Sequence, residues 1–227
     1  MDHRHDIRRG DRVLITVDVG HTLGEFDRPG TADVLREIAG APTYSAEVDR
    51  TILHVTPELT PGVARQVREL LLIPDHAWPE TWDTGGFTPY PDTFTALTRL
   101  AAIASVVALT NVSCIAGPRR LDDLDLHCGQ HLDGVFASFQ LGARKPQPYG
   151  WRIIAATHGI NVHDIVHIGD RVDDDIRGAL AAGCAAAILV TTRETLPADL
   201  RQNPRATSVP DLDGAATAIA AMTGEAA

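Results

Sequence analysis

The chain reads VLITVDVGHTL from Val13 to Leu23, and its fold can first be inferred from this stretch. Residues 13–17 form an apolar run with the length and composition of a buried strand. Asp18 follows at once and therefore stands at the carboxyl end of that strand. In open α/β sheets, ligands bind beyond the carboxyl ends of the strands. An acidic side chain at this point therefore predicts a binding or catalytic site.

Two more apolar runs end in polar residues. Ser105–Leu109 leads into Thr110-Asn111, and Ile165–Ile168 leads into Gly169-Asp170, with Asp173–Asp175 close behind. Parallel strands end at the same edge of a sheet, so these side chains are expected to converge in space. Helical and strand-like segments alternate in the second half of the chain. The sequence therefore predicts an α/β fold: a Rossmann-like parallel sheet with helices on both faces.

A single lysine occurs among the 227 residues, against nineteen arginines. It is Lys145, in the segment GARKP, which lies between the first and last acidic motifs and much nearer the last. Such isolation indicates a chemical role rather than a solubilising one. Carboxylates, a hydroxyl and an ammonium group in one place would suit a phosphoryl group together with Mg²⁺, which prefers oxygen ligands.

The four motifs, in this order, resemble those of the haloacid dehalogenase-like (HAD) hydrolase superfamily. In this chain they are Asp18–Thr22, Thr110, Lys145 and Gly169–Asp175, and the resemblance covers about residues 12 to 190. It implies a hydrolase in which Asp18 is the nucleophile, while Thr110 and Lys145 hold the phosphoryl oxygens. It also implies a Mg²⁺ cofactor, held by Asp170 and the backbone carbonyl of one glycine in the first motif.

The resemblance implies the following site. The metal-binding residues are Asp18, Gly20, Asp170 and Asp175, with Asp174 competing for the place of Asp175; the substrate-binding residues are Thr110, Asn111 and Lys145. Asp175 would support both the metal and Lys145.

One position departs from the family pattern. Phosphatases of the superfamily usually carry a second aspartate two residues after the nucleophile, where it protonates the leaving oxygen and then activates water. Gly20 stands there in this chain. Losing general acid–base help costs about 10²–10⁴-fold but need not abolish phosphoryl transfer, which depends mainly on positioning and charge neutralisation. His21 comes next, and its imidazole could either move the proton or merely hydrogen-bond the loop.

The chain is interpreted as a magnesium-dependent phosphatase that acts through an aspartyl-phosphate on Asp18. The expected substrate is a small phosphorylated metabolite, either a sugar phosphate or an intermediate of specialised metabolism. A metal-free haloacid dehalogenase-type hydrolase is one alternative, which Asp170 disfavours. A HAD-fold binding protein, catalytically impaired at Gly20, is another. The usual phosphonatase chemistry is disfavoured because it needs a second lysine for a Schiff base.

The segment between the first two motifs has a different character from the rest. Residues 31–39, 44–55 and 60–73 show helical periodicity, with prolines between them. This arrangement is similar to the helical cap that one large subgroup of the superfamily inserts after the first motif. We place the cap at residues 25–88.

The HAD-like core then comprises residues 1–24 and 89–227. Substrate choice is expected to lie in the cap, because the core motifs hold only what every substrate shares. Glycines 24, 85 and 86 are expected to act as hinges. The residues that could face the substrate are Trp78, Trp82, Phe87, His54, His76, Arg65 and Arg68.

Composition narrows the class of partner. The net charge of −10 argues against binding nucleic acid or an anionic membrane, for which a basic patch is typical. The three cysteines show neither zinc spacing nor a disulfide framework, and the charged first residues do not resemble a signal peptide. We therefore expect a cytoplasmic enzyme, as a monomer or homodimer, with a small-molecule phosphorylated substrate.

Overall fold

A six-stranded parallel sheet forms the centre of the computed structural model, which describes residues 13–192 and 195–224. The order of its strands is β5-β4-β1-β6-β7-β8. The strands are β1 (Leu14–Val17), β4 (Ser105–Thr110), β5 (Gly134–Ala137), β6 (Ile165–Gly169), β7 (Ala186–Val190) and β8 (Ala206–Val209). This confirms the predicted α/β class with a Rossmann-like parallel sheet. Residues 1–12, which the sequence assigned to the core, lie outside the described residues.

Strand β1 lies between the two strands that carry the other polar motifs. Val17 is in register with Ala108 of β4 and with Ile168 of β6. All four residues of β1 are buried, as the apolar run predicts. Because the three strands are parallel and in register, Asp18, Thr110 and Gly169 come to the same edge of the sheet.

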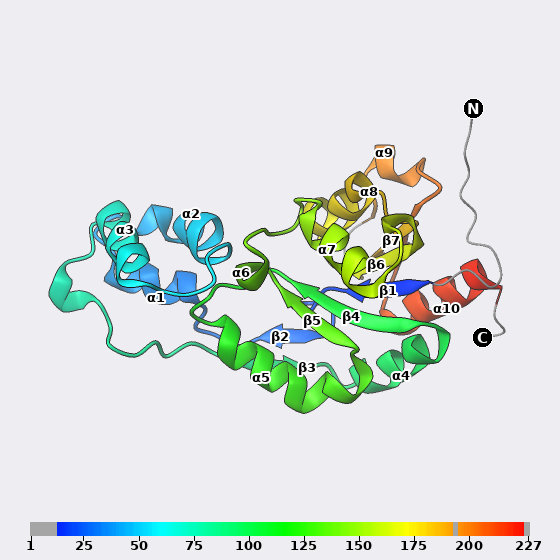
Figure 1. Cartoon of the computed structure of the whole chain (residues 1–227), viewed down its shortest axis with the longest axis horizontal. Helices are drawn as coiled ribbons and strands as arrows, with labels where there is room; N and C mark the ends of the chain where they lie inside the picture. Colours follow the sequence, from blue (N-terminus) through cyan, green and yellow to red (C-terminus); the bar gives the residue numbers. More distant parts are fainter. Residues whose placement is uncertain (1–12, 193–194, 225–227) are drawn as a thin grey trace.

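Helices cover both faces of this sheet (Figure 1). Those on one face are α4 (Thr93–Ile103), α5 (Gly117–Cys128) and α10 (Leu212–Thr223); those on the other are α7 (Tyr149–His158), α8 (Gly178–Ala182) and α9 (Ala198–Arg201). Each face has its own cluster of buried apolar side chains. The sheet edge that carries the motifs is therefore the place where polar groups meet.

Shorter elements connect these layers. They are α6 (Ser138–Leu141), the 3-10 turns η4 (Gly129–His131) and η5 (Val162–Asp164), and the π-helical turn η6 (Val172–Arg177). The last of these carries the three consecutive aspartates of the fourth motif directly into α8.

A separate group of helices lies to one side of the sheet (Figure 1). It consists of α1 (Thr31–Ile38), η1 (Pro42–Tyr44), α2 (Ser45–Val48), the π-helical turn η2 (Asp49–Leu53), α3 (Pro61–Leu71) and η3 (Asp75–Ala77). Its buried side chains, such as Leu35, Leu53 and Leu71, form a third apolar cluster with Val112 and Phe139 from the core. The division into a cap at 25–88 and a core remains a prediction, since a shared cluster joins the two parts.

A two-stranded antiparallel hairpin, β2 (Gly24–Phe26) and β3 (Phe87–Pro89), joins the helical group to the sheet. A Cβ on Gly24 would lie 2.2 Å from the carbonyl oxygen of Thr88. This close backbone approach gives a structural reason for glycine there, whereas the hinge function remains a prediction. No helix in the described part of the chain is both long and apolar enough to cross a membrane.

Candidate active site

Asp18 and Lys145 meet at the carboxyl edge of the sheet. The backbone N–H of Asp18 donates to the carbonyl of Ile168 at 2.8 Å, which ties the end of β1 to β6. Lys145 Nζ donates to Asp18 Oδ1 at 2.5 Å and to Asp175 Oδ1 at 2.6 Å. All three side chains are buried. The lysine thus stands between the first and fourth motifs, as the convergence of strand ends predicted.

Asn111 holds the backbone of Lys145 in place. Its Oδ1 accepts from the Lys145 N–H at 2.8 Å, and its Nδ2 donates to the Lys145 carbonyl at 3.0 Å. Thr110, which precedes it, is buried, and its hydroxyl has no hydrogen-bond partner among the described residues. The threonine hydroxyl is therefore available to a ligand, whereas the asparagine amide is occupied in orienting the lysine.

Three carboxylates come together around this lysine. Oxygens of Asp18, Asp170 and Asp175 all lie within 4.8 Å of one another, and no other such group occurs in residues 13–192 and 195–224. Asp170 Oδ1 is buried and finds no partner in the described part of the chain. An orphaned buried oxygen next to two further carboxylates matches the donor set of a hard cation such as Mg²⁺.

Asp175, rather than Asp174, belongs to this carboxylate cluster. Asp175 Oδ2 accepts from the backbone N–H of Arg171 at 2.9 Å, while Asp174 pairs with Arg144 Nη2 at 3.1 Å. A Cβ on Gly169 would lie 2.3 Å from Asp175 Cγ, so the glycine of the fourth motif makes room for this carboxylate.

Burial and mutual charge set the protonation of the cluster. Burial raises the pKa of Asp18, and the charges of Asp175 and Asp170 raise it further, against the effect of Lys145. Burial alone would lower the pKa of Lys145, but Asp175 and Asp18 hold it above its usual value. Burial would raise the pKa of Asp175, but Lys145 and His167 hold it below the usual range. The cluster is short of positive charge, which a cation would supply.

His167 is a member of this network that the sequence did not indicate. It lies on β6 with no exposed surface, and its Nε2 is 3.2 Å from Asp175 Oδ1. In the sequence it appeared only as one residue of an apolar strand.

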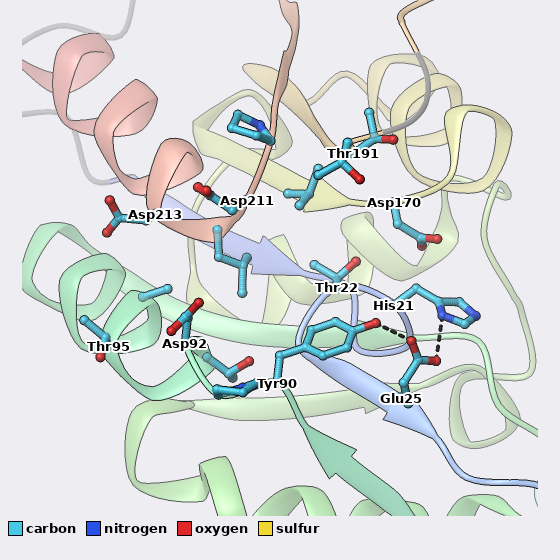
Figure 2. A pocket seen from close by; sticks show the side chains of 17 residues that line it. His21, Thr22, Glu25, Tyr90, Asp92, Thr95, Asp170, Thr191, Asp211 and Asp213 are labelled. Atoms are coloured by element: carbon cyan, nitrogen blue, oxygen red, sulfur yellow. Dashed lines mark hydrogen bonds and ion pairs between the residues drawn. The ribbon is translucent and has the colours of Figure 1, made fainter.

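His21 lies beside the site in a loop (Figure 2). Its φ is +62°, and its Nδ1 is 2.8 Å from Glu25 Oε2, while its ring is 56% exposed. Tyr90 donates its phenolic hydroxyl to the other oxygen of Glu25. Gly20, before it, is in contact with Phe26: a Cβ there would lie 3.1 Å from the ring. Glu25 thus holds Nδ1 of His21 and does not engage Nε2.

A cavity of about 260 Å³ opens over these residues. It is lined by Asp18, Gly20, His21, Phe26, Ala32, Ala46, Asp49, Arg50, His54, Thr110, Asn111, Arg144, Lys145, Arg171, Asp174 and Asp175. Core motifs and the helical group both contribute to its wall. Buried atoms without a described partner include Asp49 Oδ1, His54 Nδ1 and Arg144 Nε.

Of the seven residues expected to face substrate, only His54 lines this cavity. Trp78 and Trp82 instead pack edge to face at 5.2 Å, and Arg68 lies over the Trp78 ring at 5.9 Å. Phe87 is buried against Phe26. Arg65 and His76 line neither of the two described cavities.

Four residues that line the cavity were not predicted from the sequence: Asp49, Arg50, Arg144 and Arg171. Arg144 and Arg171 are direct neighbours of Lys145 and Asp170, so proximity to a motif was the available signal. Asp49 and Arg50 could be found only through the packing of the helical group.

A second cavity, of about 1020 Å³, adjoins the first on the side of β7 and β8. Figure 2 shows Asp170 and His21 at one end, with Asp211 and Asp213 at the other. The acidic wall is partly neutralised within the protein, because Asp213 pairs with Arg99 and Asp211 caps α10.

Comparisons with known proteins find HAD-like matches. The family model described as HAD-hydrolase-like matches residues 142–215. A glyceraldehyde 3-phosphate phosphatase from Methanopyrus kandleri is 33% identical over 96 residues, which span 42% of this chain and 40% of that protein.

Solved structures extend the likeness over most of the chain. A 2-haloacid dehalogenase from Pseudomonas syringae pv. Tomato has a TM-score of 0.60 at 20% identity, covering 93% of this chain and 99% of that one. A variant of a HAD family enzyme from Bacteroides thetaiotaomicron, in complex with magnesium and inorganic phosphate, has a TM-score of 0.56 at 16% identity, covering 82% and 97%. At these identities the structures show a common fold.

Proposed function

The chain belongs to the HAD-like hydrolases, and on this basis we propose that it is a magnesium-dependent phosphatase for a small phosphorylated metabolite. One observation carries the proposal: Lys145 Nζ bridges Asp18 and Asp175, next to an Asp170 oxygen that has no described partner. A nucleophilic carboxylate, a buried cation and a hard-metal donor set are the parts that phosphoryl transfer needs.

The carboxylates of Asp18, Asp170 and Asp175, with the carbonyl of Gly20, fit a Mg²⁺ site. Carboxylate oxygens of Asp18 and Asp175 lie within 4.8 Å of Asp170, whose Oδ1 has no described partner, and this group contains no thiol or imidazole. When bound, the ion would neutralise phosphate charge near the nucleophile. Asp174 pairs with Arg144, so it is not our choice as a ligand.

In the first step a carboxylate oxygen of Asp18 attacks phosphorus. A new O–P bond forms, the P–O bond to the metabolite breaks, and the leaving oxygen takes up a proton. In the second step water attacks the same phosphorus and gives a proton back to the group that protonated the leaving oxygen. The O–P bond to Asp18 breaks, which releases inorganic phosphate and restores the Asp18 carboxylate. Thr110 Oγ1 and Lys145 Nζ bind phosphoryl oxygens, and Lys145 also offsets the charge of the nucleophile.

The proton for the leaving oxygen comes from His21 in this scheme. It lines the same cavity as Asp18, and Glu25 holds its Nδ1, which leaves Nε2 for the substrate. In this scheme His21 takes the role of the aspartate that is absent at position 20, because it is a proton donor held in a fixed position.

The cavity bounds the size and charge of the substrate. A volume of about 260 Å³ accommodates a phosphoryl group with only a short carbon chain. Arg50 and Arg171, in its wall, favour a substrate with further oxygen atoms. A sugar phosphate of few carbons fits both features, as does the glyceraldehyde 3-phosphate named for the Methanopyrus relative.

The helical group acts as the cap of this enzyme, residues 25–88, because it supplies part of the wall over Asp18. Asp49, Arg50 and His54 come from it, whereas the phosphoryl-binding residues come from the core. Substrate choice then lies in the π-helical turn η2 rather than in the tryptophans predicted from sequence.

A panel of phosphorylated metabolites tests the function directly. We expect release of inorganic phosphate from at least one short sugar phosphate with Mg²⁺, none with a chelator, and none from the Asp18→Asn variant. Asp18→Asn keeps the size of the side chain but cannot attack phosphorus. Phosphate release that survives complete chelation would contradict the metal assignment.

The same assay separates the alternatives. Halide release from a 2-haloacid without metal would indicate a dehalogenase. Tight metabolite binding without turnover in the presence of Mg²⁺ would indicate a binding protein. Either result would overturn the proposal.

A further inference from the structure

A continuous chain of buried side chains runs beneath the site. Thr16 Oγ1 is 2.8 Å from His167 Nδ1, and His167 Nε2 is 3.2 Å from Asp175 Oδ1. The same Asp175 oxygen accepts from Lys145 Nζ, which also donates to Asp18. Thr16 and His167 both have no exposed surface. The strand pairing of β1 and β6 places them side by side, because Thr16 and His167 are in register.

For a neutral His167, the contact with Asp175 selects one tautomer. The ionised Asp175 carboxylate can only accept, so Nε2 must carry the hydrogen. Nδ1 is then an acceptor, and the hydroxyl of Thr16 is its donor. Trp151 packs edge to face on the imidazole at 5.1 Å, which closes the remaining side with an apolar wall.

The Nε2–H of His167 matters because Asp175 accepts two hydrogen bonds at the same oxygen. Its Oδ1 accepts from His167 and Lys145, while its Oδ2 accepts from the Arg171 N–H. Three donors from three directions fix the plane of the carboxylate. The position of Lys145 Nζ, and hence its distance to Asp18, depends on that plane.

We propose that His167 is a positioning residue: its Nε2–H fixes Asp175, and through Asp175 it sets Lys145 where the ammonium reaches both Asp18 and a transferring phosphoryl group. This inference rests on the proposed role of Asp18 as nucleophile. His167 does not contact the substrate.

Two substitutions of His167 make a matched pair. Gln places an amide nitrogen near the position of Nε2, whereas Asn reaches only as far as Nδ1. We expect His167→Asn to lower kcat by about 10-fold to 100-fold, the usual range for a lost supporting hydrogen bond, with little change in KM. His167→Gln should recover most of that loss. Equal losses in both folded variants would overturn the inference, as would an unimpaired His167→Asn.

Thr16 offers a second pair if His167→Asn does not fold. Thr16→Val removes the hydroxyl that donates to Nδ1 but keeps the volume, whereas Thr16→Ser keeps the hydroxyl. We expect Thr16→Val to lower kcat and Thr16→Ser to retain most of it. The opposite order, or no difference between the two, would overturn the inference.

A measurement on the resting protein is independent of turnover. Nitrogen NMR of the wild-type imidazole should show the Nε2–H tautomer, with a proton protected from solvent exchange, and Thr16→Val should mix the tautomers. An Nδ1–H tautomer in the wild type would overturn the inference whatever the activity. A correct tautomer in a protein without phosphatase activity would overturn the proposed function instead.

Discussion

Lys145 and Asp175 form an ion pair in which Nζ lies 2.6 Å from Oδ1 and neither side chain is more than 3% exposed. Asp18 takes part from the other side, so one ammonium faces two carboxylates. Buried charges of this kind are costly to separate, because removing one partner leaves the other without compensation. The pair therefore links the stability of the protein to the chemistry of its site.

Replacing Lys145 should affect both properties. Lys145→Met leaves the carboxylates unpaired, and we expect the free energy of unfolding in chelator to fall by about 3–5 kcal/mol, measured by denaturant titration. Lys145→Arg keeps the charge, but the planar guanidinium is broader than the compact ammonium that contacts both carboxylates. We expect at least about a 100-fold loss of kcat in this variant, comparable to losing an oxyanion donor. Near-normal turnover of Lys145→Arg would mean that the ammonium has no special position.

Mg²⁺ should stabilise the protein more at about pH 8 than at about pH 5. Burial raises the pKa of Asp18 and of Asp170, so between the ordinary carboxyl value and the raised one the metal-free folded protein holds more protons than the unfolded chain. Its free energy of unfolding therefore falls as pH rises through this window. Mg²⁺ binds the deprotonated form and reverses this loss, by about 2.7 kcal/mol at about 100 times its Kd.

Thermal unfolding with and without Mg²⁺, at each pH, measures this difference. The pKa of Asp175 is lowered, so its effect on the free energy of unfolding, which has the opposite sign, lies at a pH below the range that concerns Asp18 and Asp170. Burial lowers the pKa of His167, which also has the opposite sign, but that effect is present with and without Mg²⁺ and cancels. Asp170→Asn is the control and should lose most of the Mg²⁺ effect. An effect of Mg²⁺ that shrinks toward high pH would contradict the assignment of the cluster.

Much of the fold could be predicted from the sequence because its central strands are buried on both faces. β1, β4 and β6 are continuous apolar runs that end in polar side chains, and that pattern is visible without a structure. β5, β7 and β8 were not predicted; GVFA and ATSV are only four residues each, and ATSV is mixed in polarity. The hairpin of β2 and β3 was missed because its two strands are three residues each and far apart in sequence.

The site was predictable where its residues follow strands directly, as Asp18 and Asp170 do. His167 was not predicted, because a histidine inside an apolar run gives no indication of the side chains that it contacts in the fold. Asp49 and Arg50 were hidden for another reason: they reach the cavity only through the way the helical group packs on Val112 and Phe139. Their roles depend on tertiary contacts that no local pattern encodes.

The three cysteines should be unreactive in the folded protein. All are free and buried, and burial raises the pKa of Cys114 and of Cys128 to about 11 and that of Cys184 to about 12. The thiolate is the reactive form, so native protein at about pH 8 should show no fast thiol titration, with all three appearing on unfolding. Since the folded thiols hold their protons above the ordinary value of 9.0, stability should fall as pH rises beyond it. Fast labelling of native protein would contradict their burial.

His21 should control how turnover depends on the leaving group. A poor leaving group needs a proton in the transition state, whereas an aryl oxygen carries its charge more easily. With His21 as donor, the rate should fall only slightly as the leaving-group pKa rises. His21→Asn should make this dependence steep, and it suits the site because Asn tolerates a positive φ. Glu25→Gln, which weakens the hold on Nδ1, should have a smaller effect in the same direction.

Gly20→Asp is the converse test, because it restores the carboxylate that related phosphatases carry. A Cβ there meets the Phe26 ring at 3.1 Å, so the ring must move by a few tenths of an ångström. Phe26 packs on Phe87 and lies under Arg120, which resist that movement. Gly20→Ala is therefore the matched control: it has the same steric effect without the acid. We expect Gly20→Asp, measured relative to Gly20→Ala, to turn over alkyl phosphates faster, and to do so most clearly when combined with His21→Asn. If the leaving-group dependence stays the same in all of these variants, the proton comes from neither position, and His54, the other histidine in the cavity wall, becomes the residue to replace.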